Sequence, residues 1–212
     1  DEALGAGGTI ARHIEDGDSV FAISMTDGVS ARSSQTSEEI EARQEMASKS
    51  ANILGFTWIK PESFPDNAMD TISLLSITKT IEKAKREVEP SIVYTNSAAD
   101  LNVDHRITSQ ATLTAFRPQP NETWREIRAF EVPSATDYGH SNTTGFFEPN
   151  LFISIESTWN KKLEALNAYI TEMHDAPHAR SIEGLKNLAQ YRGNQVGLPL
   201  TEAFQVLRKI ER

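Results

Sequence analysis

The sequence predicts an α/β fold, a Rossmann-like three-layer sandwich with a mainly parallel sheet and helices on both faces. Over residues 1–117, short apolar runs typical of strands alternate with longer amphipathic runs typical of helices. Regular alternation of this kind is the pattern of βαβ units, whose strands lie parallel in one sheet. The 212 residues show no internal repeat and no linker-like stretch, so we expect a single domain over residues 1–212.

The first half of the chain supplies most of this pattern. Helices are expected to end at Gly17 and Gly55, because glycine accepts the left-handed backbone that follows many helices. Thr36 and Glu39 have the spacing of a capping box at a helix start. Since a βαβ unit begins with a strand, we also expect a strand before Asp1, outside this sequence. The expected helices cover residues 9–14, 36–54, 70–88 and 107–117, and the expected strands cover residues 19–25, 56–60 and 91–95.

The pattern changes after residue 125. A strand is expected over residues 127–132, and a long polar loop from Pro133 to Pro149 is expected to shape a substrate cleft. The remaining expected elements are a strand over residues 151–155, helices over 158–173 and 181–191, and a final edge strand over 203–207.

The composition excludes several classes of protein. The net charge of −9 argues against binding to nucleic acid or to an anionic membrane surface. There is no cysteine, which excludes disulfides and thiolate metal sites, so a metal would need His and carboxylate ligands. No apolar run approaches the roughly 20 residues of a membrane span. The glycines at residues 5–8 predict close packing of the first helix against neighbouring backbone, and they lack the spacing of a phosphate-binding loop.

Candidate catalytic or metal-binding residues are concentrated in residues 100–106, DLNVDHR, between an expected strand and an expected helix. In α/β folds, catalytic groups gather at the carboxyl ends of strands. His105 could be a metal ligand, a general base or part of a helix start capped by Asp104. Asp1 precedes a helix that should also follow a strand, so Asp1 and His105 could meet. Together they make two of the three protein ligands of a catalytic zinc, and candidates for the third remain open among His13, His140, His174 and His178.

Several ordered motifs resemble the PIG-L/LmbE-like zinc-dependent N-deacetylases, in their sugar-deacetylase branch. Residues 1–10, DEALGAGGTI, are similar to the end of the family's AHPDDE motif and the glycine-rich helix start after it. Residues 94–106 resemble the second metal motif. Further similar stretches are residues 26–29, 64–70, 131–134, 177–181 and 202–204, so the resemblance covers essentially the whole chain.

The resemblance implies a zinc-dependent hydrolase that holds one zinc per chain. The metal ligands would be Asp1, His105 and a histidine before this sequence, and the general base an aspartate also before it. Zinc would activate its bound water for attack on the amide. Arg43 matches an arginine placed near the substrate, and we expect Asp27 and Asn102 to contact substrate and Asp104 to take part in catalysis.

One departure from the family bears on the oxyanion. Many relatives have a histidine where this chain has Asn102, and we hypothesise that His178 supplies the missing donor, the alternative being a structural turn histidine. The expected function is removal of acetyl from an N-acetylated amino sugar of the GlcNAc type. The alternative is a non-catalytic carbohydrate-binding or scaffold protein of the same fold. We expect a cytoplasmic protein with no nucleic-acid partner and no membrane span, and a homo-oligomer is left open.

Overall fold

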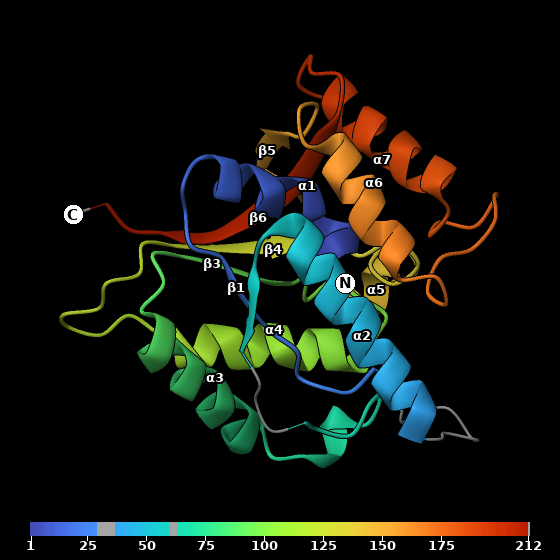
Figure 1. Cartoon of the computed structure of the whole chain (residues 1–212). Coiled ribbons are helices and arrows are strands. Elements are labelled where there is room, and N and C mark those ends of the chain that lie inside the picture. The colour runs from blue at the N-terminus through green and yellow to red at the C-terminus, as the bar shows by residue number, and fades with distance from the viewer. Residues whose placement is uncertain (29–36, 60–62, 212) are drawn as a thin grey trace. The chain divides into compact units, whose positions relative to one another are not determined.

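The structure, a computed structural model, describes residues 1–28, 37–59 and 63–211. Helices alternate with strands through much of the chain, which confirms the α/β class (Figure 1). The chain divides into two compact units that interleave along the sequence. The described parts of the first unit are residues 1–22, 37–59 and 151–203, and those of the second are residues 23–28, 63–150 and 204–211. The single domain over residues 1–212 stays a prediction.

Helices dominate the first unit, and α6 packs against both α1 and α2. Close approach depends on two glycines of α1. A Cβ at Gly8 would lie 2.6 Å from Cγ2 of Ile155, and one at Gly7 would lie 3.3 Å from Cγ of Lys162. Close packing at these glycines is therefore confirmed, with side chains rather than backbone as the neighbours. The elements are α1 (Glu2–Glu15), α2 (Ser37–Leu54), α6 (Trp159–Ala168), α7 (Ile182–Asn194), β2 (Thr57–Ile59) and β5 (Leu151–Ser154).

A buried ion pair fastens α6 and the start of β6 (Thr201–Lys209) to α1. Lys162 Nζ lies 2.6 Å from Oε1 of Glu202, and both side chains are almost fully buried. The carboxylate of Glu202 accepts the backbone N–H groups of Gly8 and Thr9, at 2.9 Å and 2.7 Å. Lys162 also donates to the carbonyl of Leu4, at 2.8 Å. In a regular α-helix Gly8 N–H and Leu4 C=O bond to each other, so the pair contacts both ends of one helical hydrogen bond.

In the second unit, α3 packs on α4 and α4 packs on β3. Their apolar faces enclose a core in which Met69, Ile77 and Ile127 are fully buried. The helix α3 begins at an N-cap, Ser73, whose side chain accepts the N–H of Ser76. The elements are η1 (Met69–Thr71), α3 (Leu74–Val88), β3 (Ile92–Asn96), α4 (Val103–Ala115), β4 (Glu126–Phe130), α5 (Ser141–Thr144) and most of β6.

The prediction of one mainly parallel sheet is wrong. Strands β3 and β4 are parallel, whereas β4 and β6 are antiparallel. The sheet order is β3-β4-β6-β5, and β1 (Phe21–Ile23) and β2 form a separate two-stranded sheet. The expected edge strand at residues 203–207 is also wrong, because β6 begins beside β5 in the first unit and continues beside β4 in the second. Helix–strand alternation in the first half does not determine the direction of a later strand, and mixed sheets are common. The three-layer arrangement stays a prediction.

Helix ends match the sequence where glycine decides them. Gly17 and Gly55 have φ of +89° and +88°, the left-handed conformation expected after a helix. The start of α4 was predicted at residue 107 and lies at Val103, because Asn102 rather than Asp104 caps it: Oδ1 of Asn102 accepts the N–H of Asp104 at 2.8 Å. Thr36 of the expected capping box lies outside the described residues.

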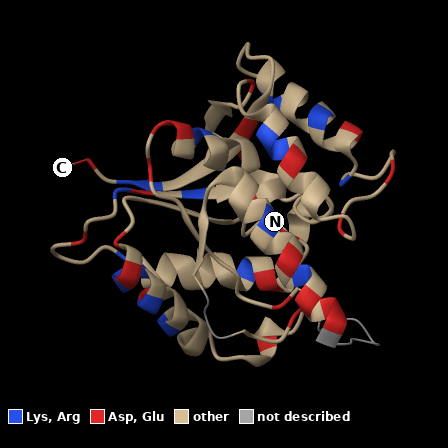
Figure 2. Cartoon of the chain, in the orientation of Figure 1, with Lys and Arg blue, Asp and Glu red and all other residues tan. Residues whose placement is uncertain are grey.

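Residues of both charge signs lie along α3 (Figure 2), among them the exposed residues Lys83, Arg86 and Glu87. This mixture agrees with a solvated face, as its sequence indicates. Of the helices that the structure describes, none has the combination of length and hydropathy that crossing a membrane requires.

Candidate functional site

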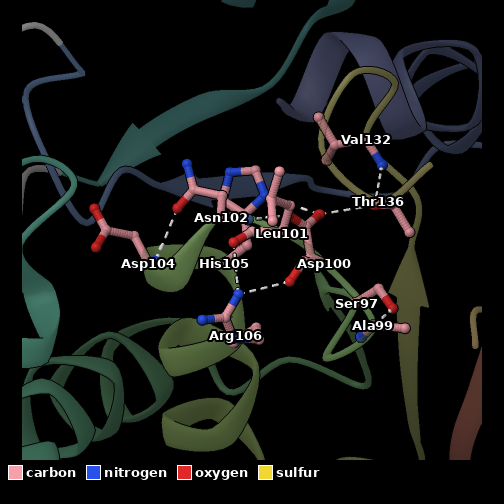
Figure 3. A network of polar contacts seen from close by, with 10 residues as sticks. All are labelled: Ser97, Ala99, Asp100, Leu101, Asn102, Asp104, His105, Arg106, Val132 and Thr136. Carbon is pink, nitrogen blue, oxygen red and sulfur yellow. Dashed lines mark hydrogen bonds and ion pairs between the residues drawn. The ribbon is translucent and has the colours of Figure 1, made fainter. Parts of the chain in front are cut away.

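The loop that follows β3 is held by a network around one buried carboxylate, Asp100 (Figure 3). Asp100 is fully buried, its Oδ1 accepts the N–H of Asn102 at 2.8 Å, and its Oδ2 accepts the hydroxyl of Thr136 at 2.7 Å. The guanidinium of Arg106 donates to the carbonyls of Asp100 and Leu101, at 2.8 Å and 2.6 Å. Oδ1 of Asn102 also accepts the N–H of Asp104 and so caps the start of α4. Together these five hydrogen bonds hold the loop from which α4 starts.

His105 lies on the first turn of α4 with its ring beside Asp100. Its Nδ1 is 3.1 Å from Oδ2 of Asp100, a contact that is short enough for a hydrogen bond but does not have the geometry of one. The side chain of His105 is 10% exposed. Metal-binding histidines commonly direct the nitrogen that does not bind the metal toward a carboxylate. The pair therefore fits a histidine whose Nε2 binds a metal, with Asp100 behind it.

Asp104 has a structural position in this unit. Its Oδ2 accepts the N–H of Asn67 at 2.7 Å, and its Oδ1 accepts the N–H of Met69 at 3.0 Å. Both oxygens thus hold the loop that leads into η1. The side chain is buried, with 6% of the residue exposed.

The same loop reaches the end of β1. Thr26 pairs with Phe64 in an isolated parallel bridge, and the hydroxyl of Thr26 donates to Oδ1 of Asp66 at 3.2 Å. Asp27, predicted to contact substrate, is the next residue and is half-buried. Hydrogen bonds therefore link the strand end at residue 26 to the helix start at residue 104 through residues 66–69.

A second group of functional candidates lies in the first unit. The guanidinium carbon of Arg43, on α2, is 4.5 Å from the ring centroid of Tyr169, a cation–π arrangement. The hydroxyl of Tyr169 donates to Oε1 of Glu2 at 2.5 Å. Burial, followed by the nearby charge of Glu2, raises the pKa of Tyr169 above its ordinary value. Asp1, beside Glu2, stands at the N-cap position of α1 and its side chain does not cap the helix.

His178 lies in the turn before α7. Its Nδ1 accepts the N–H of Arg180 at 3.0 Å, and its ring centroid is 4.2 Å from that of His174. Because Nδ1 accepts a hydrogen bond, the neutral ring carries its proton on Nε2. A donor at Nε2 is what an oxyanion needs, so this tautomer is compatible with the predicted role.

The predicted site residues fall into two sets. Asn102, Asp104 and His105 are brought together in the second unit, where Asp27 also lies, and Asp1, Arg43 and His178 belong to the first unit. That Asp1 and His105 share one metal stays a prediction. Among the residues that the structure describes, no three His, Cys, Asp or Glu side chains group as a ready set of metal ligands.

Asp100, Glu2, Thr136 and Tyr169 take part in these networks and were not predicted as site residues. Asp100 and Glu2 stand inside the two motifs that contain His105 and Asp1, and this position in the sequence could have identified them as site residues. Thr136 and Tyr169 gave no such signal, because hydrogen bonds bring them close across 36 and 167 residues of sequence.

Family membership follows from a match over more than half of the chain. The sequence model of the PIG-L family, described as GlcNAc-PI de-N-acetylase, matches residues 1–116. The chain belongs to the PIG-L family. The matched region includes the candidates Asp1, Asp27, Arg43, Asn102, Asp104 and His105.

Several solved structures have a similar architecture. The conserved protein TT1542 from Thermus thermophilus is 23% identical, with a TM-score of 0.76 over 100% of this chain and 92% of the other. N,N'-diacetylchitobiose deacetylase from Pyrococcus horikoshii is 21% identical, with a TM-score of 0.75 over 98% and 80%. GalB, the 4-carboxy-2-hydroxymuconate hydratase from Pseudomonas putida, is 22% identical, with a TM-score of 0.76 over 100% and 94%. At these identities the likeness establishes the fold alone.

Proposed function

We propose that this PIG-L family member is a zinc-dependent hydrolase that removes the acetyl group from an N-acetylated amino sugar of the GlcNAc type. The observation that carries the proposal is the placement of His105, on the first turn of the helix that follows β3, with its Nδ1 against the buried carboxylate of Asp100. Family membership supports the reaction type, and the deacetylase from Pyrococcus horikoshii has the same fold.

The proposed metal site uses residues of both motifs. His105 would bind zinc through Nε2, and Asp1 would supply a carboxylate oxygen, as the family's motifs imply. When bound, zinc lowers the pKa of its water and polarises the amide carbonyl. Asp100 orients the imidazole, and Asp104 holds the helix start by accepting two backbone N–H groups of residues 67 and 69. These two contacts support a positioning role for Asp104, which was predicted to take part in catalysis.

The remaining candidates would act on the substrate. Arg43 is proposed to bind the sugar. Its guanidinium lies over the ring of Tyr169 and can donate its N–H groups to the hydroxyls of the sugar. Asp27 and Asn102 are proposed as further substrate contacts. His178 is proposed to donate from Nε2 to the oxyanion that forms as the amide carbonyl is attacked. A cytoplasmic location, the absence of a nucleic-acid partner and the oligomeric state stay predictions.

The test measures zinc content and amine release from N-acetylglucosamine derivatives on the purified protein. We expect about one zinc per chain, with both zinc and amine release lost in His105→Ala. Gln110→Ala is the control, since Gln110 is an exposed residue of the same helix, α4, and should leave both readouts unchanged.

Other outcomes would point elsewhere. Binding of an N-acetyl sugar with neither zinc nor amine release would favour the non-catalytic carbohydrate-binding alternative. Because the structurally similar GalB is named a hydratase, amine release itself must be measured rather than substrate loss alone.

A further inference from the structure

Two buried hydrogen bonds behind His105 run in the same direction, toward Asp100. The N–H of Val132 donates to Oγ1 of Thr136 at 2.8 Å, and Thr136 Oγ1 donates to Oδ2 of Asp100 at 2.7 Å. Oδ2 of Asp100 in turn lies 3.1 Å from Nδ1 of His105. Figure 3 shows the first two contacts as dashed lines, with the ring of His105 close to Asp100.

The first two steps of this chain have a fixed polarity. A backbone N–H can only donate, so the Thr136 hydroxyl accepts from Val132 and its own hydrogen points to Asp100. The other oxygen of Asp100 accepts a second backbone N–H, that of Asn102. With donors on both oxygens, Asp100 is held as an acceptor, and the ring nitrogen facing it is favoured as a donor.

We propose that Val132, Thr136 and Asp100 form a relay that holds neutral His105 in the tautomer with its proton on Nδ1, leaving the Nε2 lone pair for the metal. Thr136 and Asp100 are positioning residues in this arrangement. The inference rests on the proposed function in one respect, the assignment of His105 as a metal ligand. The structure supports it through burial as well as polarity, because Val132 and Asp100 are 0% exposed and Thr136 is 7% exposed.

The relay explains why a threonine serves at position 136. Its hydroxyl is both the acceptor of one backbone N–H and the donor to a carboxylate, a combination that valine, its nearest isostere, cannot provide. Water is kept from these atoms by burial, so a lost donor at residue 136 is not replaced from solvent.

The primary experiment is a measurement of histidine tautomers by long-range ¹H–¹⁵N correlation on the zinc-free, ¹⁵N-labelled protein, with His105→Ala used for assignment. At about pH 9 histidine rings are ordinarily neutral. We expect the Nδ1–H form to dominate for His105 in the wild type. Dominance of the Nε2–H form would overturn the proposal without any variant.

Two substitutions at one position test the relay. In Thr136→Val the Nδ1–H form should become a mixture with Nε2–H, and zinc affinity measured by chelator competition should fall about 10–100-fold. Thr136→Ser keeps the hydroxyl and should stay within about threefold of the wild-type affinity. Thr112→Val is the matched control for losing a buried threonine hydroxyl, since Thr112 contacts Thr95 instead.

The outcomes separate the relay from the enzymatic proposal. A folded Thr136→Val protein with unchanged tautomer and unchanged zinc affinity would overturn the relay even if deacetylation is observed. A tautomer that responds as expected in a protein that releases no amine would keep the relay and reject the deacetylase function. Should Thr136→Val fail to fold, the wild-type tautomer still decides.

Discussion

Lys162→Met should cost far more stability than the same change at the preceding residue, Lys161. Lys162 is 5% exposed and its partner Glu202 is 4% exposed, so the substitution leaves a carboxylate buried without its cation. It also removes the donor to the carbonyl of Leu4. Lys161 pairs with Glu15 at a similar distance, 2.9 Å, but these side chains are 45% and 42% exposed.

The burial difference sets the expected magnitudes. Removing one partner of a buried pair typically costs about 3–5 kcal/mol, whereas an exposed pair contributes about 0.2–1 kcal/mol. In a protein of this size each kcal/mol lowers Tm by about 2–4 °C. Lys162→Met should therefore lower Tm by roughly 6–20 °C, and Lys161→Met by roughly 4 °C at most.

The assay is thermal unfolding followed by circular dichroism, with urea unfolding as a second measure of free energy. The double variant Lys162→Met/Glu202→Gln completes a double-mutant cycle. Its loss of unfolding free energy should be smaller than the sum of the losses in the two single variants, because neither charge is then buried without its partner. Equal Tm losses in Lys162→Met and Lys161→Met would refute the reasoning, as would a fully additive cycle.

Two further predictions concern residues of the same unit. Tyr169→Phe should lose about 1 kcal/mol near pH 8 with its hydrogen bond to Glu2. The raised pKa keeps Tyr169 protonated in the folded state, whereas the tyrosine of the unfolded chain ionises above about pH 10. By about pH 11 the wild type should therefore lose roughly 1.4 kcal/mol more unfolding free energy than Tyr169→Phe, measured by urea unfolding. Parallel curves of unfolding free energy against pH would contradict this. Gly8→Ala should destabilise by about 1–3 kcal/mol, because its Cβ would lie 2.6 Å from Ile155. Gly7→Ala, facing the flexible stem of Lys162, should cost less, and equal melting temperatures would contradict the packing argument.

The elements that the sequence predicted well are those decided by local chemistry. Gly17 and Gly55 end helices because few other residues accept a φ near +90° at low cost, and this requirement is readable without the fold. The helix start near residue 103 was harder. Asn102 and Asp104 are both residue types that favour the N-cap position. Only the fold shows that the carboxylate of Asp104 instead accepts the N–H groups of residues 67 and 69, which leaves Asn102 as the cap.

Long-range pairing could not be predicted in the same way. The direction of β6 depends on its register with β4, which no local pattern around residues 201–209 records. At the candidate site, His105 and Asp104 were predicted from the motif, whereas Thr136 and Tyr169 join through side-chain contacts made across distant segments. A lone threonine or tyrosine in sequence carries no sign of such a contact.

The carboxylate of Glu202 has a consequence for biosynthesis. The two amides of α1 that it accepts lie 194 and 193 residues earlier in the chain. During synthesis the ribosome therefore releases the amino-terminal helix long before its polar partner exists. Until residue 202 emerges, the N–H groups of Gly8 and Thr9 lack this carboxylate, so these two hydrogen bonds form late in synthesis. Removal of residues 201–211 should consequently weaken the packing of α1, although the two segments are far apart in sequence.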